Sequence, residues 1–335
     1  MDRILGNDEL KKHFRMAIRQ KKISHAYILE GEKGTGKKMM AEAFARILMC
    51  EAPVDRHEGP AACGRCQSCD MFSHRDHPDV VYVEHEKPAV ITVDDIRSQV
   101  VNTVDVIPYK GPYKIYIIDE AEKMNPPAQN AILKTIEEPP GYAVILLLTA
   151  NRGALLPTIC SRCILLPMQP VRVDVIKDYL IRECGAGEEA ASYAAAFSMG
   201  NTGKAREVCL SGEFRERKDF GLSLLRELPD LADYAVIRRL KDGKSQQYLT
   251  ADYLDMVEIW FRDVLVAKAA GDENRLIFRE EYEYLTDQGR LLGYEELHDI
   301  IRDVEEARLR LKANVNPDTV LELLHISIRN RYRFR

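Results

Sequence analysis

The chain carries Gly31-Glu32-Lys33-Gly34-Thr35-Gly36-Lys37-Lys38 between an apolar run at residues 26–29 and a helical pattern at residues 39–49. A strand, a glycine-rich loop and a helix in this order predict a phosphate-binding loop, because glycines let backbone N–H groups converge on phosphate oxygens. Lys37 is placed to reach the outer phosphates. The stretch predicts an α/β domain around a nucleotide-type site, with these candidate contacts: Gly31, Gly34, Thr35, Gly36, Lys37 and Lys38.

The last position of this loop departs from the phosphate-binding pattern. The pattern ends in Ser or Thr, whose hydroxyl holds the Mg²⁺ of a bound nucleotide, and this chain has Lys38 there. A lysine cannot ligate that ion, which places Mg²⁺ binding in doubt. We expect the Lys38 ammonium to occupy the Mg²⁺ position and to pair with Asp119 or with a phosphate. The alternative is that Lys38 turns away into solvent.

Two acids follow a buried strand that the apolar run at residues 114–118 predicts. Asp119 and Glu120 come directly after this run, about 80 residues beyond the phosphate loop. Acids at the carboxyl end of a parallel strand can hold Mg²⁺ and orient a water beside the phosphates. We therefore interpret Asp119 as a metal ligand and Glu120 as the residue that orients water, in a site that is vestigial or weakly active.

Strand and helix patterns alternate through the first half of the chain. Apolar runs at residues 80–83, 114–118, 143–148 and 164–166 are separated by helical patterns. This alternation predicts a parallel sheet with helices on both faces. The prolines within residues 167–170 mark a boundary, and the remaining sequence is helical in pattern throughout.

Four cysteines follow the first helix of the phosphate-loop unit in the spacing C-x12-C-x2-C-x2-C, in a segment rich in Gly, Pro and charge. Four thiolates in an insert with little apolar surface predict a closed structural zinc site, because the metal supplies the folding energy that the insert lacks. The alternative is a set of surface thiols without metal. The predicted ligands are Cys50, Cys63, Cys66 and Cys69.

Composition limits the remaining possibilities. The chain has 335 residues, which is long enough for two or three domains with ample core. Its formal net charge is −5, and 30% of its residues are charged. Its overall charge gives no argument for binding to nucleic acid or membrane, so any such contact must be local. The sequence has no apolar run of 18 residues and no apolar signal segment at its start, so we expect a cytoplasmic protein.

Taken together, these motifs resemble the clamp-loader branch of the AAA+ family. The helix that runs into Pro139-Pro140 and the turn Ser161-Arg162-Cys163 are the most specific features, whereas the phosphate loop alone fits any P-loop protein. The resemblance is dense in the first half of the chain and only general in the second. The matching segments are the four-cysteine insert and residues 4–7, 25–27, 118–122, 130–140 and 156–163.

The resemblance implies three domains. Residues 1–167 would form the AAA+ P-loop domain, with the zinc-binding insert at residues 50–69. Residues 168–212 would form a small helical lid, and residues 213–335 a helical collar through which subunits of the family join into a ring.

It also implies roles for particular residues. Arg162 would be an arginine finger that projects into the ATP site of a neighbouring subunit and stabilises charge on the γ-phosphate. The lid position that holds a nucleotide-sensing arginine in ATP-hydrolysing members is Gly203 here, with Lys204 or Arg206 as less well oriented substitutes. Lys38 and Gly203 together indicate a stationary subunit, in which ATP or ADP binding is weak or absent.

We therefore expect a clamp-loader subunit of the bacterial DNA polymerase III holoenzyme with poor or no ATPase activity of its own. It would scaffold the loader ring and donate Arg162 in trans. The implied partners are gamma/tau ATPase subunits, the delta subunit, the sliding clamp and primed DNA, at the replisome and not at a membrane. One alternative is an active gamma/tau-type ATPase, and another is a P-loop regulator or DNA-binding protein unrelated to replication.

Overall fold

The structure is a computed structural model that describes residues 1, 4–241, 251–313 and 315–333. Within these ranges the first part of the chain forms a parallel five-stranded sheet in the order β4-β5-β6-β1-β7. This order places the phosphate-loop strand β1 between β6 and β7. The strands are β1 (Ala26–Glu30), β4 (Val80–Tyr82), β5 (Lys114–Ile118), β6 (Ala143–Thr149) and β7 (Ile164–Pro167).

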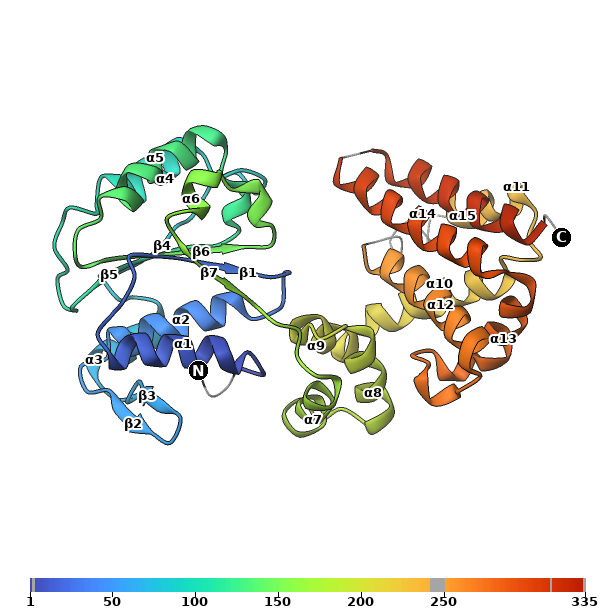
Figure 1. Cartoon of the computed structure of the whole chain (residues 1–335), viewed down its shortest axis with the longest axis horizontal. Helices are drawn as coiled ribbons and strands as arrows, with labels where there is room; N and C mark the ends of the chain where they lie inside the picture. The colour runs from blue at the N-terminus through green and yellow to red at the C-terminus, as the bar shows by residue number, and fades with distance from the viewer. Residues whose placement is uncertain (2–3, 242–250, 314, 334–335) are drawn as a thin grey trace. The chain divides into compact units, whose positions relative to one another are not determined.

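Helices cover both faces of this sheet (Figure 1). One face packs against α1 (Asp8–Arg19), α2 (Lys37–Leu48) and α3 (Gln67–His74). The other packs against α4 (Val93–Ile96), the following helical turn η1 (Arg97–Val101), α5 (Pro126–Glu137) and α6 (Pro157–Cys160). The predicted α/β fold with helices on both faces is confirmed.

The strands divide the core into two layers because successive side chains point to opposite faces. Along β1, Tyr27 and Leu29 pack with α1 and α2, whereas Ala26 and Ile28 pack with α5 and α6. All four side chains are fully buried. A strand buried on both faces requires an unbroken apolar run, which explains why residues 26–29 are all apolar.

The cysteine insert has more regular structure than its composition predicts. Between α2 and α3 it contains an antiparallel hairpin of β2 (Val54–Arg56) and β3 (Gly59–Ala61). The sequence suggested a loop-like segment. The hairpin is stabilised by Arg15 of α1, which packs on Gly59 and pairs with Glu58 at 2.5 Å, a long-range contact that no local pattern reveals.

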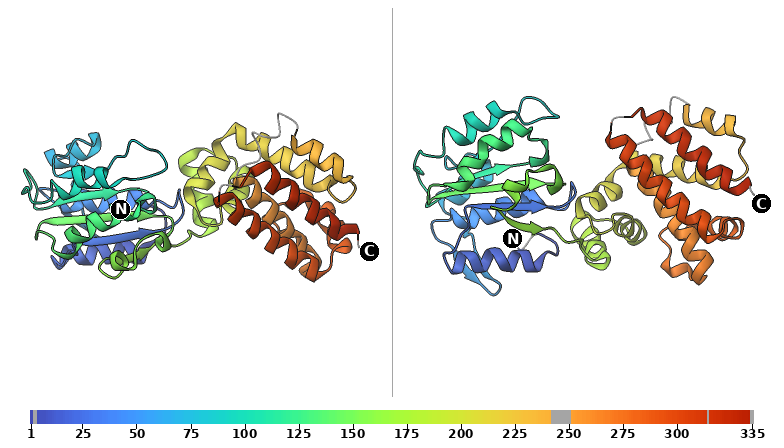
Figure 2. Two further views of the ribbon diagram at one scale, coloured as in Figure 1. Left: turned by 90° about the horizontal axis from the view of Figure 1, so that it is seen from above. Right: turned by 45° about the horizontal axis from the view of Figure 1, so that its top comes forward.

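Beyond β7, the described residues are helical, as predicted. Contacts divide the chain into two compact units, residues 1–179 with 198–205 and residues 180–197 with 206–335. In the second unit α10 to α15 pack against one another, as Figure 2 shows from two further directions. The helices are α7 (Val173–Cys184), α8 (Glu188–Phe197), α9 (Thr202–Leu210), α10 (Gly212–Glu227), α11 (Asp233–Lys241), α12 (Ala251–Ala270), α13 (Tyr282–Leu291), α14 (Tyr294–Lys312) and α15 (Pro317–Arg333).

Buried polar contacts fix the packing of this second unit. Trp260 lies at the centre of α12, and its indole N–H donates to Gln288 of α13 at 2.8 Å. His325 of α15 is also fully buried and contacts the hydroxyl of Tyr253 at 2.5 Å. Across the described ranges, no helix is both long and apolar enough to cross a membrane.

Candidate functional site

The phosphate loop has the conformation that its glycines predict. Gly34 and Gly36 have φ angles of 92° and 93°, a left-handed region that residues with a Cβ rarely adopt. This geometry turns the chain from the end of β1 at Glu30 into α2, which begins at Lys37. The first N–H groups of α2 are therefore available at the loop, as a phosphate site requires.

Lys37 is held by the loop itself. Its ammonium donates to the carbonyl oxygens of Gly31 at 2.5 Å and Glu32 at 2.9 Å, and the residue is 9% exposed. Burial is the main reason why the pKa of Lys37 lies below its usual value, against the attraction of nearby carboxylates that include Glu122 and Asp119. The loop is thus internally hydrogen-bonded around the lysine that would reach a phosphate.

Lys38 pairs with Asp119, as the sequence predicts. The Lys38 Nζ lies 3.3 Å from Asp119 Oδ2, and the two side chains are 42% and 40% exposed. The alternative, in which Lys38 turns away from the site into solvent, is not the conformation observed. The ammonium therefore lies beside the carboxylate that was predicted to hold Mg²⁺.

Glu120 is also engaged in an ion pair. Its carboxylate lies 2.6 Å from the ammonium of Lys123, and its backbone is left-handed, with a φ angle of 51°. The structure places Asp119 with Lys38 and Glu120 with Lys123, so each of the two acids has a neighbouring cation.

A segment far along the chain closes on the phosphate loop. The Gly203 N–H donates to the Gly34 carbonyl at 3.0 Å, and the Asn201 amide donates to the Lys33 carbonyl at 2.8 Å. A Cβ added at Gly203 would lie 2.7 Å from the Gly34 Cα and carbonyl oxygen. Sequence reasoning noted Gly203 but missed Asn201, whose only signal is a polar side chain just before α9.

Arg162 lies at the amino ends of the parallel strands, whereas the phosphate loop lies at their carboxyl ends. It directly precedes β7, which runs parallel to β1 with Tyr27 beside Ile164, whereas the phosphate loop follows the carboxyl end of β1. The strand separating the two edges has five residues and is about 16 Å long at ~3.3 Å per residue. Arg162 cannot contact the phosphate loop of its own chain in this fold.

Neighbouring groups orient the Arg162 side chain. Its guanidinium pairs with Glu137 at the end of α5 at 3.0 Å and donates to the Thr158 carbonyl at 3.1 Å. The side chain remains 39% exposed. A positioned but accessible guanidinium is suited to contact an anionic group on another molecule.

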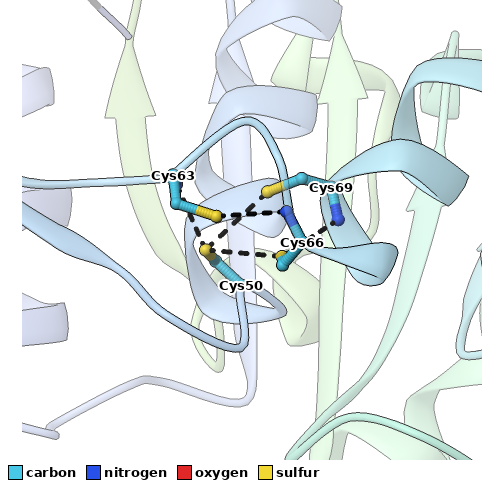
Figure 3. A group of neighbouring side chains, drawn as sticks. All are labelled: Cys50, Cys63, Cys66 and Cys69. Atoms are coloured by element: carbon cyan, nitrogen blue, oxygen red, sulfur yellow. Dashed lines mark hydrogen bonds between the residues drawn. The ribbon is translucent and has the colours of Figure 1, made fainter.

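The four predicted metal ligands lie together, with their Sγ atoms all within 4.8 Å of one another. Figure 3 shows the four side chains pointing toward a common centre. Cys50 Sγ lies 3.9 Å from Cys66 Sγ and 3.7 Å from Cys69 Sγ. Tetrahedral zinc with Zn–S bonds of ~2.3 Å requires sulfur separations of about 3.8 Å, so this cluster could hold a metal such as zinc.

Backbone donors favour thiolate at part of this cluster. Hydrogen bonds from the N–H groups of Arg65 and Cys66 lower the pKa of Cys63 to about 6. Burial raises the pKa of Cys50 to about 12. Because metal ligands must be deprotonated, a bound cation would supply the charge that the buried Cys50 thiolate needs.

Known proteins are similar to this chain over different shares of its length. A family model described as "DNA polymerase III, delta subunit" matches residues 6–172. DNA polymerase III subunit delta′ of Bacillus subtilis is 29% identical over 316 residues, covering 92% of each chain. Subunit delta′ of Pseudomonas aeruginosa is 40% identical over 144 residues, 42% of each chain.

A second class of relative is named as a tau subunit. DNA polymerase III subunit tau of Bacillus subtilis is 37% identical over 162 residues, which are 48% of this chain and 27% of that protein. The match to this delta′ subunit therefore covers nearly the whole chain, and the match to this tau subunit covers about half of it. The chain belongs to the DNA polymerase III delta′ family.

Proposed function

We propose that the chain works as a stationary clamp-loader subunit, which completes the ATP site of a neighbouring subunit instead of hydrolysing ATP at its own. The observation that carries this proposal is the place of Arg162. The residue lies at the edge of the sheet away from its own phosphate loop, with an oriented and partly exposed guanidinium. A finger of this kind contributes roughly 10³ to 10⁵ to the rate in comparable nucleotide hydrolases.

Three contacts support a poor or absent ATPase at the chain's own site. The Lys38 ammonium pairs with Asp119 and would compete with Mg²⁺ for that carboxylate. Gly203 and Asn201 donate hydrogen bonds to carbonyl oxygens of the phosphate loop. Gly203 occupies the lid position where the family's ATPases carry an arginine. In this proposal Gly31, Gly34, Thr35 and Gly36 retain the shape of a nucleotide site, and ATP or ADP binds weakly or not at all.

The proposal includes a structural zinc ion on the four clustered cysteines. The sulfur spacing and the lowered pKa of Cys63 support it. The ion would hold the hairpin and α3 together and has no part in phosphate chemistry. Zinc would thus stabilise one face of the sheet.

The partners follow from the family. The relatives are named as delta′ and tau subunits of DNA polymerase III, which supports association with gamma/tau ATPase subunits. The delta subunit, the sliding clamp and primed DNA would be met in the assembled ring, in the cytoplasm at the replisome. Residues 1–167, 168–212 and 213–335 would serve as the P-loop domain, lid and collar.

The test is reconstitution of the loader with Arg162→Ala and Arg162→Lys. Both should lower ATP turnover by the ATPase subunits by about 10³-fold or more, with assembly intact, because lysine lacks the planar fork of donors. Arg172→Ala, which removes an 81% exposed side chain in a local ion pair, is the control. Unchanged turnover in the Arg162 variants would remove the finger from the proposal.

Retention of Asp119 and Glu120 favours a second candidate, an active gamma/tau-type ATPase. This reading predicts steady Mg²⁺-dependent ATP turnover by the isolated chain. Turnover measured with the wild-type chain alone separates it from the stationary subunit.

A further inference from the structure

Ser68, which lies directly before Cys69 at the start of α3, makes contacts that reach beyond the cysteine cluster. The residue is 1% exposed. Its hydroxyl donates to the carbonyl of Met49, directly before Cys50, at 2.7 Å. The same hydroxyl lies 3.0 Å from Nε2 of His77, a residue outside the insert. Ser68 therefore joins the two segments that supply the buried cysteines and also links them to a neighbouring part of the domain.

This pattern of hydrogen bonds fixes the tautomer of His77. The Ser68 hydroxyl gives its single proton to Met49, so its contact with His77 requires the ring nitrogen Nε2 to donate. The other ring nitrogen, Nδ1, accepts the backbone N–H of Asp79 at 3.2 Å. Burial lowers the pKa of His77, in agreement with a neutral ring. His77 is therefore an Nε2–H imidazole that connects Ser68 to the backbone of Asp79.

Asp79 extends this connection to a turn at the surface. The residue is 2% exposed, and its carboxylate accepts three consecutive backbone N–H groups. The donors are Tyr109 at 2.5 Å, Lys110 at 2.8 Å and Gly111 at 2.9 Å. Burial alone would raise the pKa of Asp79, but these donors hold it below its usual value. Because a buried carboxylate gives up such donors only at a large cost, the position of Asp79 determines the conformation of the turn.

Both sequence neighbours of Cys50 contact the same turn. The Glu51 carboxylate lies 3.4 Å from the Lys110 ammonium. The Met49 side chain packs against Gly111 so closely that an added Cβ would lie 2.1 Å from the methyl carbon. Cys50 thus lies between two residues that contact the turn, and a shift of this cysteine would move both contacts.

The four thiols alone hold this arrangement weakly. Cys50 Sγ lies 3.9 Å from Cys66 Sγ and 3.7 Å from Cys69 Sγ, and thiols are poor hydrogen-bond donors and acceptors. Metal–thiolate bonds are far stronger, and in small metal-binding segments their free energy is folding free energy. The positions of Cys50 and Cys69, and of the residues attached to them, therefore depend on whether a cation is bound.

We propose that metal occupancy of the cysteine cluster fixes the surface turn at residues 109–111, through the hydrogen bonds that lead from Ser68 to Asp79. This inference rests on the zinc ion of the proposed function, and it extends the effect of the ion from the insert to another part of the domain surface. The turn carries Tyr109, which is 88% exposed. Metal loss thus changes how that surface is presented.

The test is hydrogen exchange of the full chain in the zinc-loaded form and after removal of the metal with a chelator. Exchange at the amides of residues 109–111 should become roughly 10-fold faster or more after chelation, because the carboxylate that accepts them loses its support. Amides of β6 are the reference, since this strand is buried along its whole length in the middle of the sheet. Their exchange should change by less than twofold.

Ser68→Ala tests the connection while the metal stays bound. The change removes the acceptor of the His77 Nε2–H, and a buried donor without a partner is costly. Exchange at residues 109–111 should become roughly 5- to 30-fold faster, with the zinc content unchanged by atomic absorption. Ser73→Ala is the matched control, because Ser73 lies on the same helix and its hydroxyl donates to the Cys69 carbonyl at 3.1 Å, away from this connection.

The outcomes separate this inference from the proposed zinc site. If the chain binds zinc but residues 109–111 exchange within twofold of wild type after chelation, or in zinc-loaded Ser68→Ala, the inference is overturned and the zinc site stands. Ser73→Ala that loosens the turn as much as Ser68→Ala also overturns it. If chelation exposes β6 as well, zinc-loaded Ser68→Ala decides by the same twofold criterion. A wild-type chain that binds no zinc overturns both the zinc site and the inference.

Discussion

Replacement of Lys38 by threonine tests why the phosphate loop would not work with Mg²⁺. The change removes the ammonium beside Asp119 and restores a hydroxyl at the metal position. The pair is about two-fifths exposed on each side, so solvent screens it and its loss should alter the free energy of unfolding by at most ~1 kcal/mol. The folded state should therefore survive the substitution.

The effect on Mg²⁺ should be larger. An ammonium about 4 Å from a divalent cation is repelled by about 2 kcal/mol in a water-like dielectric, and breaking the pair adds up to ~1 kcal/mol. The sum predicts that Mg²⁺ strengthens ADP binding roughly 30- to 150-fold more in Lys38→Thr than in wild type. Removal of a positive charge without this geometry should give no such gain.

Calorimetric titration of ADP with and without Mg²⁺ measures the difference. Lys33→Thr is the matched control, because Lys33 is an exposed lysine of the same loop whose backbone carbonyl contact with Asn201 is retained. Equal Mg²⁺ dependence in wild type and Lys38→Thr would refute the reasoning. Strong Mg²⁺-dependent binding by wild type would refute it more directly.

Three further predictions concern other parts of the chain. Burial lowers the pKa of His325 to about 4, so the free energy of unfolding that is fully present above pH 6.5 is lost as the pH falls toward 4. Between neutral pH and pH 5, the free energy of unfolding measured in urea should fall by about 2 kcal/mol more in the wild type than in His325→Gln. Chelation should release one zinc per chain, measured by atomic absorption, and should expose the insert to protease; Cys66→Ser should bind no metal at neutral pH. Gly203→Ala should destabilise the chain by ~1–3 kcal/mol through overpacking against Gly34, and hydrogen exchange at residues 33–35 should become faster.

Local patterns predicted the parts of the site that depend on neighbouring residues in the sequence. The strand, loop and helix around residues 26–49 follow from an apolar run and a glycine spacing, and the four cysteines follow from their spacing alone. The Lys38 pair with Asp119 was also predictable, because parallel strands bring their carboxyl ends to one edge of a sheet.

Contacts between distant segments were not predictable. Asn201 and Gly203 donate hydrogen bonds to the phosphate loop, which lies more than 160 residues earlier in the sequence. No sequence pattern around either residue indicates which residue it contacts. Asp79 is a single aspartate without a motif, and its role follows only from three backbone donors that lie about 30 residues away. Tertiary packing decides such contacts, so the structure was needed to find them.

The separation of Arg162 from the phosphate loop, on opposite edges of one sheet, gives the chain two unlike ends. Under the proposed function, proteins with this layout would join head to tail, because the arginine of one would have to meet the loop of the next. A member whose loop is inactive would complete the ATP site of one neighbour, and its interface with the other neighbour would contain no active ATP site. In a closed ring, such a member would mark where the series of working sites begins and ends, and so give the ring a direction.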